Sequence, residues 1–212
     1  MASRPYQALK GALLYLVLFI LPALMAPAGD TIHRLVVSGM LRQLFLYTIP
    51  ALLLCLFLIN KGEHLKVLFK PAKSDGAMLV LLLLFLTICA LLYRLLAVLT
   101  DTGELTISFE PSVIAWSTLV IFTLCSVLLE ESFFRAWLPE QFKLAGLSPR
   151  ISIVLSALLF SLAHFKQGFP GMTQALFAGL FLGWAAQKTG RLVAPIVSHS
   201  LFNMAVWIIS LS

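Results

Sequence analysis

Charged residues are scarce in this sequence of 212 residues, of which they make up only 11%. Soluble globular domains carry about 25% charged residues. Hydrophobic residues make up 60% of the chain, which excludes an ordinary soluble domain and indicates an integral membrane protein. The apolar stretches use nearly the whole length, so we expect one compact membrane domain and no separate soluble domain.

Cysteine and several enzyme motifs are also scarce or missing. Cys55, Cys89 and Cys125 lie in apolar stretches without CxxC or Cys/His spacing, so we interpret them as small buried hydrophobic residues. No HExxH, GxGD or GxSG element occurs, which argues against the zinc, aspartyl and serine intramembrane proteases. The net charge of +6 is spread over short loops without an aromatic-interleaved basic patch, so no nucleic-acid partner is expected.

Apolar runs predict an all-α fold, a polytopic membrane helix bundle of about seven transmembrane helices. The predicted spans are Gly11–Ala26, Gln43–Asn60, Ala77–Thr100, Val113–Leu138, Ile151–Phe165, Met172–Gln187 and Leu192–Ile209. The first span also resembles a signal peptide with a cleavage site at Ala26-Pro27-Ala28. We favour an uncleaved anchor, because the later spans need a first helix to pack against.

Three short patterns predict the ends and contacts of the later spans. The fourth span is expected to stop at Pro139, and Gly168-Phe169-Pro170-Gly171 is expected to form a turn before the sixth. Thr189-Gly190 is expected to form a tight hairpin. Gly179 and Gly183 have the small-residue spacing that lets two helices approach closely.

The basic residues predict the orientation. Those in predicted inside segments are Arg4, Lys10, Lys61, Lys66, Lys70, Lys73, Lys143, Arg150, Lys188 and Arg191, and those in outside segments are Arg34, Arg42 and Lys166. This excess favours a cytoplasmic amino terminus. A short chain with almost no soluble part suits a prokaryotic plasma (inner) membrane. We divide the chain into accessory spans at residues 1–112 and a catalytic bundle at residues 113–212.

The fourth span carries three ionisable residues, Glu130, Glu131 and Arg135. Each such group costs about 2.5 to 3.5 kcal/mol at bilayer depth, so we expect partners or a function for them. Glu131 and Arg135 are four residues apart with the acid first, which predicts an intrahelical ion pair. Glu130 lies about 100° around the helix and remains an unpaired carboxylate, available as a general base.

Two more polar pairs occur at membrane depth. Phe160 and His164 are four apart on the fifth span, and His199 and Asn203 are four apart on the seventh, so each pair shares a helix face. Counted along the helices, Glu130 and the polar members of both pairs lie about 11 to 20 Å from the same membrane side. We therefore predict a shared site on spans 4, 5 and 7, in a water-filled cavity reached from the cytoplasmic side.

These motifs, in this order, resemble those of the CPBP family (CAAX protease and bacteriocin-processing, or ABI), intramembrane glutamic-type endopeptidases. The likeness covers roughly residues 113–203, and no motif position departs from the pattern. It implies that Glu130 with His164 activates a water, while His199 and Asn203 hold the oxyanion. The supporting residues would be Glu131, Arg135 and Phe160. The implied substrate is a membrane-associated or lipid-modified peptide or protein, with no cofactor.

Other interpretations use the same residues differently. Glu130, His164 and His199 could supply a three-ligand zinc site with an open position, but Asn203 is a poor zinc ligand, so we favour metal-free catalysis. A non-proteolytic scaffold or a bacteriocin-immunity-type membrane protein would need the motifs only for structure. A small transporter would use the acids and histidines as a pathway, but the chain shows no inverted repeat.

Overall fold

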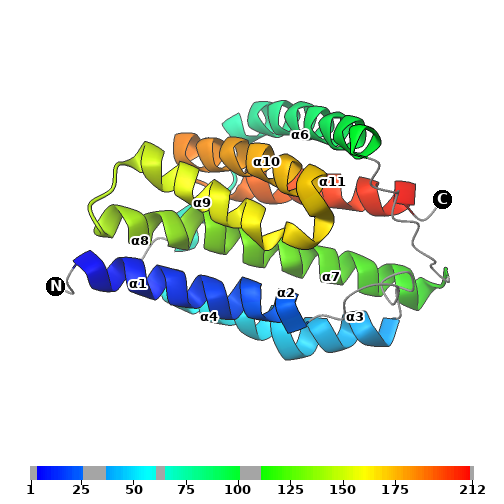
Figure 1. Cartoon of the computed structure of the whole chain (residues 1–212), viewed down its shortest axis with the longest axis horizontal. Helices are drawn as coiled ribbons and strands as arrows, with labels where there is room; N and C mark the ends of the chain where they lie inside the picture. Colours follow the sequence, from blue (N-terminus) through cyan, green and yellow to red (C-terminus); the bar gives the residue numbers. More distant parts are fainter. Residues whose placement is uncertain (1–3, 26–36, 61–64, 101–110, 211–212) are drawn as a thin grey trace.

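The computed structural model describes residues 4–25, 37–60, 65–100 and 111–210. Every regular element in these ranges is a helix, which confirms the predicted all-α class. The long helices run roughly along the longest axis of the molecule, with α7 near the middle of the bundle (Figure 1). Helix α6 lies at one edge in this view, and α1 and α4 lie at the opposite edge. The cleavage site considered at Ala26-Pro27-Ala28 lies outside the described residues.

Within the described ranges the helices follow one another without strands between them, and three of them are continued by π-helical turns. The first half contains α1 (Arg4–Tyr15), η1 (Leu16–Ile20), α2 (Leu21–Met25), α3 (Val37–Gln43), η3 (Leu44–Thr48), α4 (Ile49–Asn60), the short α5 (Leu65–Leu68) and α6 (Ser74–Leu99). The second half contains α7 (Val113–Glu131), η4 (Ser132–Trp137), α8 (Leu138–Leu144), α9 (Pro149–Ala163), η5 (Phe165–Gln167), α10 (Gly168–Thr189) and α11 (Val193–Ser210).

Several of these segments are long and apolar enough to cross a membrane. Within the described residues, four helices meet this test alone: Val37–Ile59, Ser74–Leu99, Val113–Leu144 and Val193–Ser210. The pair Pro149–Ala163 and Phe165–Thr189, bent by 60° at its break, meets it together and makes a fifth candidate. The chain is an integral membrane protein, and the count of seven spans stays a prediction.

Two predicted boundaries are wrong, and both were predicted at a proline. The fourth span does not stop at Pro139, because the helix continues through α8 to Leu144. Likewise, Gly168-Phe169-Pro170-Gly171 is not a separate turn but the first turn of α10. Pro170 is tolerated because the first turn of a helix needs no backbone N–H from it, whereas Pro139 directly follows the π-helical turn η4, where the regular hydrogen bonding is already interrupted. Gly168 has a φ of 68°, so the chain reverses at this residue and the helix begins directly.

The main core joins the two halves of the chain. Aromatic side chains from η4 and α9 pack with residues from the first and second helical segments. Tyr15 on α1 is buried and donates a hydrogen bond from its hydroxyl to the backbone oxygen of Leu159 on α9, at 2.9 Å. The first helix is therefore packed against the helices that carry the later motifs. The predicted division of the chain near residue 112 stays a prediction.

Helices α9 and α10 approach closely at small residues. A Cβ atom added to Gly179 would lie 3.2 Å from the Cα of Ala157, and one added to Gly183 would lie 3.0 Å from Cγ2 of Ile153. The predicted role of the Gly179/Gly183 spacing is thus confirmed. The predicted hairpin is also present, because α10 ends at Gly190 in the left-handed conformation, with φ of 65°.

Polar contacts fasten this hairpin to α6. Arg191 donates from Nε to Oδ1 of Asp75 at 3.2 Å and from Nη2 to Ser74 at 2.8 Å. The backbone N–H of Leu192 donates to the oxygen of Leu68 at 2.8 Å. The loop before α6 and the hairpin at Gly190, which the distribution of basic residues assigned to the same membrane side, are therefore in contact at one end of the bundle.

Candidate active site

Glu131 is fully buried at the end of α7, where it has two partners. Its Oε2 lies 3.3 Å from Nε of Arg135, so the predicted intrahelical ion pair is present. Its Oε1 lies 2.8 Å from Nδ1 of His199 on α11. Because a carboxylate paired with a guanidinium is an acceptor, Nδ1 of His199 carries the proton of this hydrogen bond. Glu131 thus fixes both the position of α11 and the orientation of the His199 ring.

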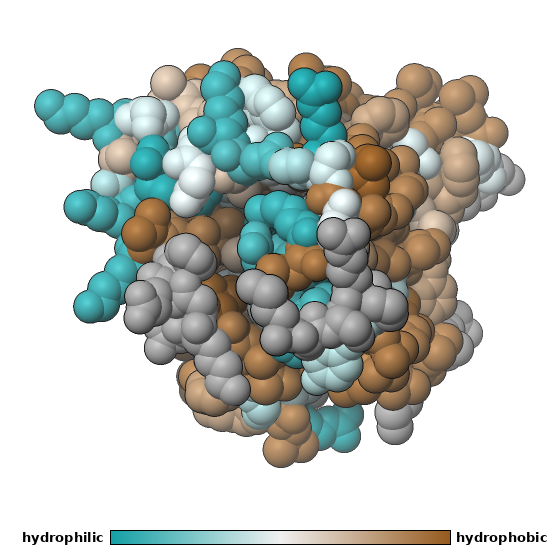
Figure 2. All heavy atoms as spheres, turned by 90° about the vertical axis from the view of Figure 1, so that its left-hand side faces the viewer, coloured by the Kyte–Doolittle hydropathy of each residue, from teal (hydrophilic) through white to brown (hydrophobic). Residues whose placement is uncertain are grey.

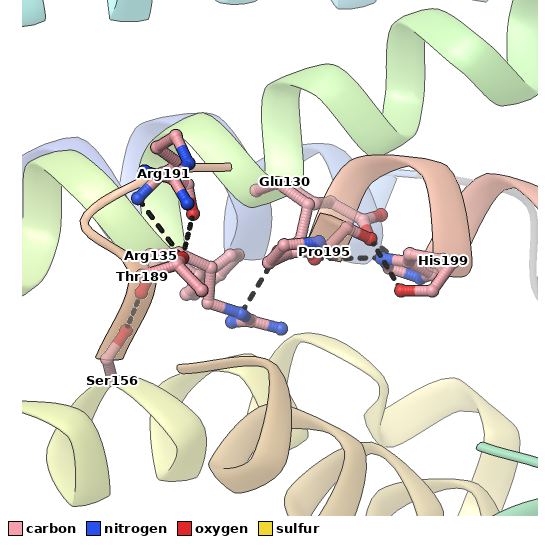
Figure 3. Close-up of polar contacts among 10 residues, drawn as sticks. Glu130, Arg135, Ser156, Thr189, Arg191, Pro195 and His199 are labelled. Atoms are coloured by element: carbon pink, nitrogen blue, oxygen red, sulfur yellow. Dashed lines mark hydrogen bonds and ion pairs between the residues drawn. The ribbon is translucent and has the colours of Figure 1, made fainter. Parts of the chain in front are cut away.

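The other ring nitrogen of His199 faces the neighbouring acid. Nε2 lies 3.8 Å from Oε2 of Glu130, and the two side chains point toward each other from α11 and α7 (Figure 3). The Glu130 side chain is 24% exposed, whereas that of Glu131 is 0% exposed. One of the two consecutive acids is therefore enclosed and the other accessible, and His199 lies between them. The predicted role of Glu130 as an unpaired base stays a prediction.

A cavity of about 250 Å³ contains the accessible acid. Its walls come from several helices and consist of Phe19, Pro22, Gln43, Tyr47, Glu130, Phe134, Phe160, Ala163, His164 and Gln167. Glu130 and His164 thus share a single space that is large enough for several water molecules.

His164 lies where α9 ends and the 3₁₀ turn η5 begins. Its Nδ1 is 2.8 Å from the backbone oxygen of Phe160, and the two rings are 4.5 Å apart between centroids. A carbonyl oxygen only accepts hydrogen bonds, so Nδ1 is the donor and the neutral ring keeps its lone pair on Nε2. A carboxylate and an imidazole lone pair are thus both available at this cavity.

Arg135 is enclosed beneath these residues. Its guanidinium lies 4.5 Å from the centre of the Phe160 ring, and its side chain is 1% exposed. Phe134 forms an edge-to-face contact with Phe160 at 5.1 Å, so the cation is surrounded by aromatic carbon. This environment suits the predicted supporting roles of Arg135 and Phe160.

The two residues expected to hold the oxyanion lie outside the cavity wall. His199 is 7% exposed and is not among the residues that line it. Asn203 is half-buried one turn further along α11 and also does not line it. Within the described residues, no hydrogen bond involves the Asn203 side chain. The structure therefore places Glu130 beside His199 and in one cavity with His164.

The comparison with protein families agrees with this arrangement. Residues 112–205 match the family model described as type II CAAX prenyl endopeptidase Rce1-like. The chain carries an Rce1-like domain. All seven motif residues lie within it, and the resemblance to the CAAX protease family is confirmed. Neither a search of curated proteins nor a search of solved structures found a match.

The wall of the cavity extends beyond the Rce1-like domain. Phe19 and Pro22 come from the first helical segment, and Gln43 and Tyr47 come from the second. Sequence reasoning missed all four. A signal was present for the last two, because a glutamine and a tyrosine four residues apart in an apolar span share one helix face.

Three π-helical turns border the cavity. Each of these turns contributes one residue to the cavity wall: Phe19 from η1, Tyr47 from η3 and Phe134 from η4. Glu130 lies two residues before η4 begins at Ser132. A π-helical turn inserts an extra residue into a helix and redirects the side chains that follow, and such turns are frequent at functional sites. The helices are thus irregular where they meet the Rce1-like site.

A second, larger cavity of about 650 Å³ lies toward the end of the bundle that carries α8. Its wall is largely apolar, and Lys10, Glu140, Lys143 and Gln187 lie around it. Figure 2 shows hydrophilic atoms gathered around a hollow on this end of the molecule. Phe134 lines both cavities, so the two spaces meet at this residue. The predicted access from the cytoplasmic side stays a prediction.

The zinc alternative requires three ligands around one point. Among the described residues, no group of three or more His, Cys, Asp or Glu side chains is arranged to hold a metal ion. Glu130, His164 and His199 therefore do not fit a three-ligand zinc site here, and no catalytic step is assigned to a metal. Metal-free catalysis stays a prediction. The three cysteines are free thiols, and Cys55 and Cys89 are buried.

Proposed function

We propose that this protein is an intramembrane endopeptidase that uses Glu130 and His164 to activate a water molecule. The observation that carries the proposal is the shared cavity, in which a partly exposed carboxylate and an imidazole lone pair face the same space. The Rce1-like domain supplies the reaction class, since its family description names an endopeptidase.

The chemistry needs one water molecule and no redox partner. Glu130 accepts a proton from the water, and the oxygen attacks the carbonyl carbon of the substrate. The resulting tetrahedral intermediate carries its negative charge on the former carbonyl oxygen. The C–N bond then breaks, and the proton held by Glu130 passes to the leaving nitrogen. Proton transfer by a positioned side chain contributes about 10² to 10⁴ in rate.

His199 positions Glu130 in this proposal. Its Nδ1–H is held by Glu131, and its Nε2 faces Glu130 at 3.8 Å. A hydrogen bond between Nε2 and Glu130 needs a proton between them, so it forms once Glu130 has taken the proton of the water and can donate it to the Nε2 lone pair. Histidines held by a carboxylate at one nitrogen are well suited to orient a second group with the other. The oxyanion role expected for His199 and Asn203 stays a prediction.

The proposed substrate is a membrane-associated peptide or protein that carries a lipid modification. Two features support this class. The family description names a CAAX prenyl endopeptidase, and the larger, mostly apolar cavity, lined mainly by residues of the Rce1-like domain, offers room for a hydrocarbon chain. The amino terminus is proposed to be cytoplasmic in a prokaryotic plasma membrane, because the basic residues favour that side.

Replacement of Glu130 tests the proposed activity. The membrane peptidomes of cells that express the wild type or Glu130→Gln are compared, and a peptide cut only by the wild type is then assayed with both purified proteins. We expect Glu130→Gln to lower the rate by about 10² to 10⁴ while the protein still inserts and purifies. Thr87→Val is the control, because this exposed residue lines neither cavity and its hydroxyl donates only to the Leu83 oxygen of its own helix.

Two results would contradict the proposal. If Glu130→Gln cut a verified substrate as fast as the wild type, the base assignment would be wrong. If the wild type cut no peptide and loss of the protein caused only an assembly defect, the scaffold interpretation would replace the enzyme.

A further inference from the structure

The small cavity presents polar groups from both halves of the chain. Glu130 and His164 belong to the Rce1-like domain, whereas Gln43 and Tyr47 belong to the second helical segment, outside the region matched by the family. The segments are in direct contact, since η3 packs against α7 and α4 packs against η4. Any substrate carbonyl that reaches Glu130 therefore enters a space with a tyrosine in its wall.

The reaction proposed for Glu130 requires a hydrogen-bond donor in that space. A tetrahedral intermediate places a negative charge on oxygen, and donors already aimed at that position stabilise it strongly. His199 and Asn203 do not line the cavity. Glu130 and neutral His164 present acceptors to it. Three neutral donors remain, the amides of Gln43 and Gln167 and the phenol of Tyr47.

Tyr47 is the best placed of these three donors. Gln43 and Gln167 are exposed, whereas Tyr47 is half-buried and its ring packs against the main core. Tyr47 and Glu130 line the same cavity. In the described part of the chain, no hydrogen bond engages the Tyr47 hydroxyl, so its proton is available to a ligand.

The local backbone also distinguishes Tyr47. It lies inside the π-helical turn η3, between Gln43 and Ile49, which interrupts an otherwise regular apolar helix. Such turns cost regular hydrogen bonding and are frequent where a helix contributes to a functional site. If the Tyr47 ring served only to pack against the core, a phenylalanine would serve as well, and no hydroxyl would be needed in the wall of a polar cavity.

We propose that Tyr47 is a catalytic residue whose phenol O–H donates a hydrogen bond to the oxyanion of the tetrahedral intermediate. This inference rests on the proposed peptidase activity of the same site. Tyr47 transfers no proton in this step. Its hydrogen bond forms as the carbonyl oxygen gains charge and is released when the C–N bond breaks and the carbonyl returns.

Tyr47→Phe tests the proposal because it removes only the hydroxyl and keeps the ring that packs in the core. We expect kcat to fall by about 10² to 10³, as for other oxyanion donors. KM should stay within about threefold, since the bond forms only as the transition state is approached. The unfolding temperature should not change.

Tyr15→Phe is the matched structural control. Tyr15 lies in the same core cluster but outside the cavity, and its hydroxyl is bound to the Leu159 oxygen. Its loss should lower the unfolding temperature and leave kcat unchanged, the opposite pattern to Tyr47→Phe.

Asn203→Ala separates the two possible oxyanion donors. A kcat for Tyr47→Phe within about threefold of the wild type, together with a fall of about 10² or more for Asn203→Ala, would overturn the role of Tyr47. If the fall in kcat of Tyr47→Phe were accompanied by a lower unfolding temperature, as expected for a structural role, this would also overturn the proposal. In both cases, loss of activity in Glu130→Gln would show that the proposed peptidase function still stands.

Discussion

His199 and Glu131 are 68 residues apart in the sequence, yet Nδ1 of the histidine lies 2.8 Å from Oε1 of the acid. This hydrogen bond connects α11 to α7 inside the bundle. Because the same carboxylate faces Arg135 on its own helix, one buried acid holds a cation and an imidazole at once. The second glutamate of the Glu-Glu pair thus organises the site, while the first is left to face the cavity.

Glu131→Gln should lower stability at least as much as activity. The glutamine keeps the size of the side chain but removes the charge that balances Arg135, whose side chain is 1% exposed. Loss of one member of a buried pair typically costs about 3 to 5 kcal/mol. Thermal unfolding and yield in detergent measure this. The double variant Glu131→Gln/Arg135→Met should recover part of the loss, and a double variant no more stable than Glu131→Gln would contradict a structural ion pair.

Sequence periodicity predicted the contacts of this site that lie within single helices. The Glu131–Arg135 pair and the Phe160–His164 contact are both four-residue spacings, which one helix turn brings together. The contact of His199 with Glu131 follows from no local pattern, because it depends on how α11 packs against α7. Chemistry alone suggested that polar groups at membrane depth would gather, and no spacing could tell which acid the histidine binds.

The limits of the sequence are clearest at the helix ends and in the first half of the chain. Proline suggested that the fourth span stops at Pro139, yet a π-helical turn before it lets the helix continue into α8. Gln43 and Tyr47 match none of the motifs that resemble the CAAX protease family, so the sequence did not indicate them as site residues. Their place in the cavity wall is set by the packing of η3 against α7, which only a three-dimensional structure describes.

His164→Gln and His199→Gln should differ in stability although both lower activity. His164 is half-buried, and its hydrogen bond is to a carbonyl of its own helix, so its loss should cost less than about 1 kcal/mol of folding free energy. His199 is held by buried Glu131, so its replacement should cost about 1 to 3 kcal/mol in addition to activity. Chemical unfolding and cleavage assays on the same preparations measure both. Equal stability of the two variants would argue against the linking role of His199.

Gly183→Val should destabilise the contact between α9 and α10. The added Cβ would approach Cγ2 of Ile153 to 3.0 Å, and the further methyl groups have no space between the helices. Overpacking of this kind typically costs about 1 to 3 kcal/mol. Gly76→Ala is the control, because the added Cβ meets no atom within 4 Å. Alanine also favours a helix more than glycine does, so this variant should not be destabilised. A thermal unfolding curve for Gly183→Val that matched the wild type would show that the close approach is not needed.

Removal of metal should leave cleavage unchanged. The proposed steps use a carboxylate and imidazole groups, and the described histidines and acids form no group of three that could hold an ion. Wild-type enzyme is dialysed against a strong chelator, its zinc content is measured, and the cleavage rate is compared before and after. Activity should persist at a metal content far below one ion per chain. A rate that fell with the metal and returned when zinc alone was added back would instead require Glu130, His164 and His199 to move together as zinc ligands. Glu130→Gln, which removes one of these ligands, would then lower zinc content as well as activity, whereas in the metal-free mechanism it lowers activity alone.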